Sequence, residues 1–216
     1  MTLYEGRHTD LKNRINRHLK KLTGKDFDFY DNMSQNDFIE LKTVLSDIHN
    51  VLTFKTTISA ANWLCRYFKI NKKIKNKILE GVDQTKPNTS GFDILISEPY
   101  KIIAEVKCIS PVNNGGKFGA AQSNSILDDF HFLKNGKGLL SNTSKHYKFL
   151  FLLDLDERTD QAITQLLRPS KGTSERPLRV NRHKIKEHIV LFKETDKLSD
   201  LSLNKVYLKR IKIGKL

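Results

Sequence analysis

Apolar residues recur at helical spacing through the first 80 positions of the chain. Four such stripes follow one another, at residues 11–22, 38–52, 58–68 and 70–78. Apolar positions three and four residues apart are typical of amphipathic helices. Ser34 and Asp37 form a capping-box pattern before the second stripe, and Gly81 follows the fourth as a helix end would. The pattern predicts a helical N-terminal region made of packed helices.

After Gly81 the pattern becomes strand-like. Residues 92–97 and 101–109 predict two strands that form a hairpin around the turn at Glu98-Pro99. The later apolar runs predict a helix through 126–133 that ends near Gly136, a fully buried strand at 149–153, a helix at 156–167, and strands at 189–192 and 206–213. This order predicts an α/β fold with a mixed central sheet flanked by helices. We expect one globular unit, in which the helical region 1–80 packs on the core 81–216.

The second predicted strand carries two charged residues in an otherwise apolar run. Because side chains alternate between the two faces of a strand, Glu105 and Lys107 share one face, about 7 Å apart, and Val106 points to the other. Asp93 lies in the preceding strand, with eleven residues between it and Glu105, and the turn between them can bring it beside that carboxylate. The sequence therefore predicts that two carboxylates and a lysine converge.

Phosphodiester cleavage needs these groups. Carboxylate oxygens are suitable ligands for Mg²⁺, which offsets the charge that develops on a phosphate. A nearby lysine can stabilise the same charge. The alternative is an ion pair of Glu105 with Lys107 on an exposed strand and a turn role for Asp93. The apolar character of the remaining strand favours the catalytic interpretation, because charges there must be functional or solvated at a cleft.

The segments Gly91-Phe92-Asp93 and Ala104-Glu105-Val106-Lys107 resemble the PD-(D/E)XK nuclease superfamily, to which most type II restriction endonucleases belong. The resemblance covers about residues 91–153 and implies a restriction-endonuclease-like sheet. It implies that Asp93, Glu105 and the main-chain carbonyl of Val106 bind the metal, and that Lys107 is the catalytic lysine. Phe92 replaces the proline that is usual before the aspartate. The family often adds an acid from an upstream helix, for which Glu80 and, less well, Asp83 are the candidates.

The formal charge of +14 favours a polyanionic partner, with nucleic acid first. Two segments account for the excess, because residues 66–86 have a net charge of +5 and residues 168–216 have a net charge of +9. A glycine-containing loop at 113–119 lets Lys117 approach a phosphate, with Gln122 on the helix behind it, but a flexible loop fits equally well. The basic segment 170–186 suits DNA contact or a charged loop. Its candidate DNA-binding residues are Lys171, Arg176, Arg179 and Arg182.

Residues 57–80 fit either a helix-turn-helix reader of DNA or a helical cover with a solvated face, and we favour the cover. Asp154 and Asp156 form a competing acidic pair at a strand end, where Asp156 is better explained as a helix cap. Cys65 and Cys108 lie in apolar stretches, which predicts buried thiols and a reducing compartment. No run is apolar enough to span a bilayer, and we expect a cytoplasmic protein without membrane contact.

Together these features predict a Mg²⁺-dependent type II restriction endonuclease that cuts double-stranded DNA and leaves 5′-phosphates, as the superfamily does. A symmetric recognition site favours a homodimer, and a cognate DNA methyltransferase is the functional partner that would protect the host genome. Two alternatives remain. One is a repair or recombination nuclease that recognises DNA structure, and the other is a non-catalytic helix-turn-helix regulator.

Overall fold

The computed structural model describes residues 3–84, 91–112, 116–168 and 185–214. The chain divides into two compact units, residues 1–48 and 49–216. The boundary between the units lies inside one long helix, α3 (Gln35–Tyr67). The sequence predicts a boundary near residue 80 instead, and this residue lies within the second unit. No helix in the described ranges combines the length and the apolar character that crossing a membrane requires.

The first unit contains α1 (Leu3–Thr23), α2 (Phe29–Asn32) and the start of α3. The side chain of Asn16 links α1 to α2: its amide donates to Asp28 at 2.7 Å, and its oxygen accepts from the Tyr30 amide at 2.9 Å. Asp28 in turn caps α2 by accepting from the Asp31 amide. Ser34 and Asp37 bond reciprocally at the start of α3, which confirms the predicted capping box.

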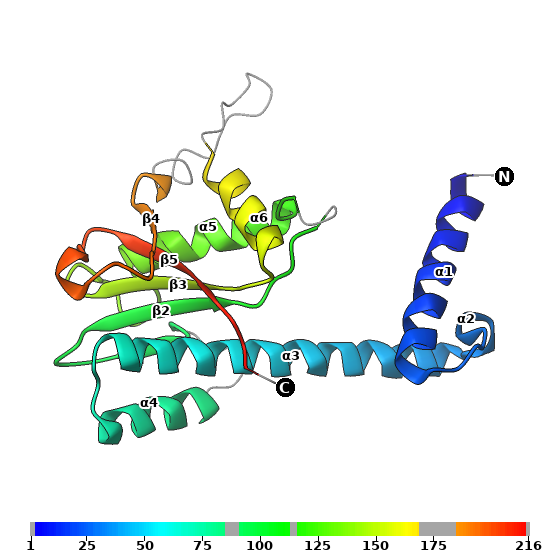
Figure 1. Ribbon diagram of the computed structural model, residues 1–216, viewed down its shortest axis with the longest axis horizontal. Coiled ribbons are helices and arrows are strands. Elements are labelled where there is room, and N and C mark those ends of the chain that lie inside the picture. The colour runs from blue at the N-terminus through cyan, green and yellow to red at the C-terminus, as the bar shows by residue number, and fades with distance from the viewer. Residues whose placement is uncertain (1–2, 85–90, 113–115, 169–184, 215–216) are drawn as a thin grey trace. The chain divides into compact units, whose positions relative to one another are not determined.

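The described part of the second unit contains a five-stranded mixed sheet in the order β1-β2-β3-β5-β4 (Figure 1). Its strands are β1 (Ile94–Ile96), β2 (Ile102–Lys107), β3 (Tyr147–Leu153), β4 (Ile189–Leu191) and β5 (Val206–Ile211). The hairpin partner β1 is antiparallel to β2, whereas β2, β3, β5 and β4 run parallel. This arrangement confirms the predicted α/β class and mixed sheet. The strongly apolar β3 lies in the middle, as its continuous hydrophobic run predicts.

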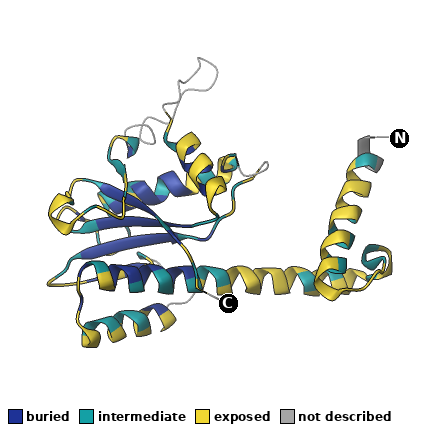
Figure 2. Cartoon of the chain, in the orientation of Figure 1, coloured by how far each residue is buried: buried dark blue, intermediate teal, exposed yellow. Residues whose placement is uncertain are grey.

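Helices cover both faces of the sheet (Figures 1 and 2). The second half of α3 and the following α4 (Lys72–Gln84) cover one face, where Leu64 and Trp63 pack with Ala104, Val106 and Phe149. The helices α5 (Ala120–Asn135) and α6 (Glu157–Leu167) cover the other, where Phe130 and Ile163 pack with Ile103 and Leu150. This second face contains the candidate site.

The helices of the N-terminal region differ from their prediction in one respect. The stripes at 38–52 and 58–68 belong to the single helix α3 rather than to two helices. Neither glycine nor proline interrupts the connecting residues, and the Thr56 and Thr57 hydroxyls donate to carbonyls one turn earlier, at 2.7 and 3.0 Å. The fourth helix runs past Gly81 to Gln84, because Val82 is buried in the core.

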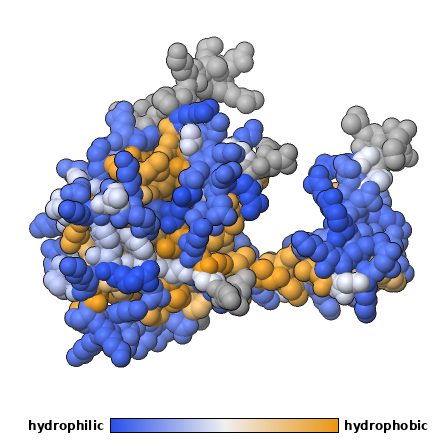
Figure 3. Space-filling view, in the orientation of Figure 1, coloured by the Kyte–Doolittle hydropathy of each residue, from blue (hydrophilic) through white to orange (hydrophobic). Residues whose placement is uncertain are grey.

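Two residues of the apolar stripe in the first half of α3 are exposed, although the pattern predicts packing. Leu45 and Ile48 are 54% and 50% exposed, and Figure 3 shows orange apolar side chains along this helix. Periodicity predicts the apolar face of a helix but not whether another element covers that face.

Lys148 is buried in β3 with 1% of its surface exposed. Its ammonium donates to the carbonyls of His146 and Leu203, at 2.8 and 2.6 Å. Burial lowers the pKa of Lys148 from 10.5 to about 8, and the nearby charge of Lys134 adds to this effect.

The lowered pKa of Lys148 makes the stability of the protein depend on alkaline pH. Between pH 8 and 10.5 the unfolded chain binds more protons than the folded one, so stability rises with pH. We expect the unfolding free energy of the wild type to rise relative to Lys148→Met by about 1–3 kcal/mol from pH 7.5 to 9.5 in urea denaturation. The exposed Lys145→Met control should follow the wild type. A constant difference between wild type and Lys148→Met would contradict this account.

Candidate functional site

The hairpin register places Asp93 beside β2. Ile94 pairs with Ala104 in the antiparallel ladder, and one further step places Asp93 across from Glu105. The main-chain amide of Val106 donates to Asp93 Oδ2 at 2.7 Å, which fixes the orientation of this carboxylate. Asp93 itself is exposed. The structure therefore brings Asp93 and the charged positions of β2 together, at the place where the sequence predicts convergence.

Glu105 and Lys107 project from the face of β2 that α5 covers. Their neighbour Val106 packs in the core on the α3 face, and Ile103 packs with α5, in accordance with strand alternation. The exposed fraction of Glu105 is only 3%, whereas the Lys107 side chain is 25% exposed. Glu105 is thus the buried member of the pair, and Lys107 is the member that solvent reaches.

Two residues that the sequence analysis missed complete this group. Asp129 of α5 lies with its Oδ2 2.8 Å from Lys107 Nζ, and Lys137, which follows α5, donates to Glu105 Oε1 at 2.7 Å. Asp129 carries a signal in the sequence, because it is an acid on the apolar stripe that includes Ile126, Phe130 and Leu133. Lys137 carries none, because it lies in a loop whose direction the sequence leaves open.

The electrostatics of the site follow from its composition. Among the described residues it contains the carboxylates of Asp93, Glu105 and Asp129 and the ammonium groups of Lys107 and Lys137. Burial, and then the charge of Asp93, raises the pKa of Glu105 to about 8 despite its bond to Lys137. Burial likewise raises the pKa of Asp129, although Lys107 acts against it.

Lys137 shows the complementary effect. Burial acts to lower its pKa, but the bond to Glu105 and the charges of the three carboxylates outweigh burial and raise it. The charges of Asp93 and Asp129 act in the same direction on both groups, because each raises the pKa of Glu105 and the pKa of Lys137. The site is therefore short of positive charge.

The remaining predicted site residues lie elsewhere or serve the main chain. Glu80 and Asp83 are exposed on α4, and the acid that pairs with Lys107 is Asp129 of α5. Lys117 is exposed beside Val112, with which it forms an isolated bridge. The side-chain oxygen of Gln122 accepts from the main-chain amide of Gly119 at 2.9 Å, and its side-chain nitrogen donates to the main-chain carbonyl of Ser110 at 3.0 Å. Gln122 thus closes the loop before α5. The predicted DNA contacts Lys171, Arg176, Arg179 and Arg182 lie outside the described residues.

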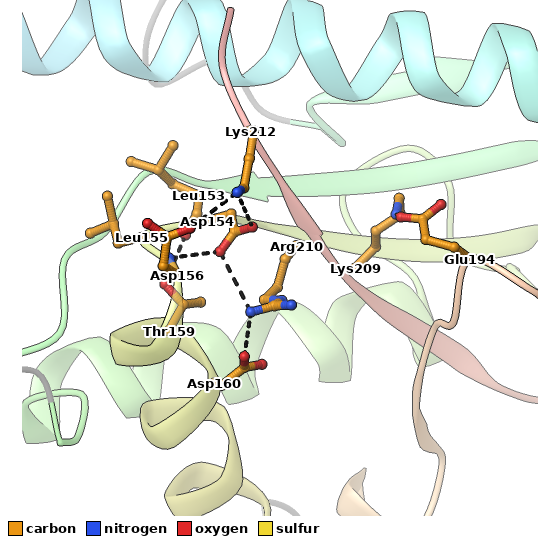
Figure 4. A network of polar contacts seen from close by, with 10 residues as sticks. All are labelled: Leu153, Asp154, Leu155, Asp156, Thr159, Asp160, Glu194, Lys209, Arg210 and Lys212. Carbon is orange, nitrogen blue, oxygen red and sulfur yellow. Dashed lines mark hydrogen bonds and ion pairs between the residues drawn. The ribbon is translucent and has the colours of Figure 1, made fainter.

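The competing acidic pair is neutralised by basic residues of β5 and its extension (Figure 4). Asp154 lies 3.6 Å from Arg210, and Asp156 lies 3.0 Å from Lys212. Arg210 also pairs with Asp160 of α6 at 2.6 Å. Asp156 occupies the N-cap position of α6, as predicted, but its side chain makes no capping bond there. These acids bind to cations of the chain itself and together hold α6 to the end of the sheet.

Other chemistry-bearing side chains are also accounted for by packing. Lys209 of β5 pairs with Glu194, which is drawn in Figure 4, and its ammonium lies 4.7 Å from the centre of the Trp63 ring. Cys65 and Cys108 are free and buried, as predicted. In the described ranges, no three His, Cys, Asp or Glu side chains are grouped so as to hold a metal ion by themselves. No family model, curated protein or solved structure matches the chain significantly.

The raised pKa of Glu105 has a consequence for stability. The folded protein retains this proton up to a pH of about 8, whereas the ordinary pKa is 4.5, so stability falls as the pH rises between these values. We expect the wild type to lose on the order of 2–4 kcal/mol relative to Glu105→Gln from pH 5 to 8, in urea denaturation with a chelator present.

Glu98→Gln serves as the control for this measurement, because Glu98 is exposed and its ion pair with Lys101 lies at the surface, where such pairs contribute little to stability. This variant should follow the wild type across the whole pH range. If the unfolding free energies of wild type and Glu105→Gln run parallel from pH 5 to 8, burial does not shift the ionisation of Glu105.

Proposed function

We propose that the protein is a Mg²⁺-dependent type II restriction endonuclease, which recognises a short sequence in double-stranded DNA and hydrolyses one phosphodiester in each strand. The observation that carries the proposal is the hairpin register, which holds Asp93 beside Glu105 with Lys107 on the same face. The order of hairpin, α5 and β3 is also the core order of the PD-(D/E)XK superfamily, and a restriction-endonuclease-like fold forms part of the proposal.

The donor set of this site fits a Mg²⁺ ion. Mg²⁺ keeps most of its waters and needs only one or two protein carboxylates in addition to a substrate phosphate, so Asp93 and Glu105 suffice. Asp93 uses Oδ2 for the Val106 amide, which leaves Oδ1 for a ligand. The site contains three carboxylates and two ammonium groups, and this excess of acids also favours a divalent cation. The main-chain carbonyl of Val106 is the third ligand in this proposal.

The residues of the chain have separate roles in the proposed reaction. A bound Mg²⁺ supplies Lewis-acid stabilisation of the phosphate and makes a water easier to deprotonate. Lys107 presents its ammonium to the developing negative charge on the phosphate. Asp129 holds this ammonium at 2.8 Å and so limits the orientations of the long side chain. Cleavage that leaves a 5′-phosphate belongs to the same proposal.

Binding to DNA is supported by the charge of the chain and by its exposed lysines. The net charge of +14 favours contact with phosphates, and Lys72, Lys73 and Lys77 of α4 are all exposed. We place the protein in the cytoplasm, as a homodimer that matches a symmetric site. A DNA methyltransferase of the same specificity is its functional partner.

Plasmid cleavage tests the proposal directly. Supercoiled plasmid with Mg²⁺ should yield discrete fragments with the wild type and none with a chelator. Asp93→Asn and Lys107→Met should each reduce the cleavage rate at least ~100-fold, because they remove a metal ligand and the cation at the phosphate. The measurement is the fraction of cut plasmid over time on an agarose gel.

Two matched variants make this assay specific. Asp156→Asn removes an exposed acid from the pairs of Figure 4, and Lys145→Met removes an exposed lysine, so both should cleave like the wild type. Nicking that depends on branched or damaged DNA would instead assign a repair nuclease. Intact plasmid that binds all variants equally tightly would exclude a nuclease and favour a DNA-binding regulator.

A further inference from the structure

Glu105 already has a cation beside it. The Lys137 ammonium lies 2.7 Å from Glu105 Oε1 and thus occupies a position from which a metal would contact this buried carboxylate. A carboxylate buried without any partner is costly, so some cation must accompany the ionised form. Lys107 does not supply it, because its ammonium pairs with Asp129. The two lysines of the site therefore have different partners.

The loop after α5 holds the backbone of Lys137 in a fixed place. Gly136 ends α5 with a φ of +106°, and a Cβ there would lie 2.6 Å from the Leu140 carbonyl oxygen, so only glycine fits. Lys137 and Leu140 then exchange both of their main-chain hydrogen bonds, at 3.0 and 3.1 Å. This tight turn fixes the point from which the lysine side chain reaches Glu105.

The side chain of Lys137, in contrast to its backbone, reaches the solvent. It is 29% exposed, and its ammonium lies 5.9 Å from the centre of the partly exposed Phe132 ring. A long lysine side chain with this exposure can turn outward and remain tethered at the edge of the site. At that edge its charge would be available to a phosphate of a bound nucleic acid.

We propose that Lys137 is a resident counter-ion, which pairs with the Glu105 carboxylate whenever this group is ionised without a metal, and which a divalent cation displaces when it binds. Two cations compete for one carboxylate oxygen, so Lys137 weakens metal binding while it keeps Glu105 compensated. This inference rests on the proposed metal site, but it concerns metal affinity rather than DNA cleavage. Lys137 is then a positioning residue that acts through Glu105.

Manganese binding to the whole chain without DNA tests this competition. Mn²⁺ serves as the probe, and the free ion is measured by electron paramagnetic resonance at pH 8.5. Lys137→Met should bind Mn²⁺ about tenfold more tightly than the wild type, because the competing ammonium is gone. Lys145→Met removes the same charge from an exposed position away from these pairs and should bind like the wild type. A purely structural lysine would produce no gain in affinity.

Three further variants locate the effect. Lys137→Arg retains a cation and should bind Mn²⁺ as weakly as the wild type. In the Glu105→Gln background, Lys137→Met should give no gain, because the shared carboxylate is absent. Lys137→Gln repeats the test with a polar side chain in case the methionine variant does not fold, which circular dichroism monitors.

The outcomes separate this inference from the proposed function. Unchanged or weaker Mn²⁺ binding by Lys137→Met and Lys137→Gln overturns the counter-ion role, even if the wild type cuts plasmid with Mg²⁺. Failure of every variant to bind Mn²⁺ also overturns it. Tighter binding by Lys137→Met that depends on Glu105, in a protein that cuts no DNA, supports the counter-ion role and refutes the nuclease.

Discussion

The second unit is organised around a carboxylate buried inside its sheet. Glu105 lies in β2 among residues that are buried on both faces. A carboxylate removed from water and left unpaired costs several kcal/mol, so the elements around it must supply compensation. Lys137 supplies a direct ion pair, and Asp93, across the hairpin from Glu105, is exposed to solvent. Titratable groups with a strongly shifted pKa are frequent at functional sites, so the buried Glu105 is an argument for function.

The sheet order explains how distant parts of the chain reach this carboxylate. β2 pairs with β1 on one side and with the central β3 on the other, so the hairpin brings Asp93 from one edge. The crossover between the parallel strands β2 and β3 contains α5, which therefore lies over the face that carries Glu105 and Lys107. Asp129 and Lys137 enter the site through this crossover, whose geometry parallel pairing requires.

The opposite face of the sheet provides the rigid support. Trp63 of α3 makes edge contacts with the Phe149 and Phe151 rings of β3, both at 5.7 Å between centroids. Lys209 lies over the Trp63 ring from β5, so one aromatic side chain connects a helix with two strands. Because this face is closely packed, a site on the other face is held on strands that cannot shift independently.

The sequence by itself determined the fold class and the grouping of Asp93, Glu105 and Lys107. Strand alternation fixes Glu105 and Lys107 on one face, and the continuous apolar run of β3 fixes the centre of the sheet, because both follow from local periodicity. The position of Asp93 followed from the hairpin turn. The packing of Leu45 and Ile48 in α3 was mispredicted, since periodicity identifies an apolar face but not whether a partner covers it. Only the tertiary structure brought in Asp129 and Lys137, because their approach to β2 depends on how the α5 crossover packs on the sheet.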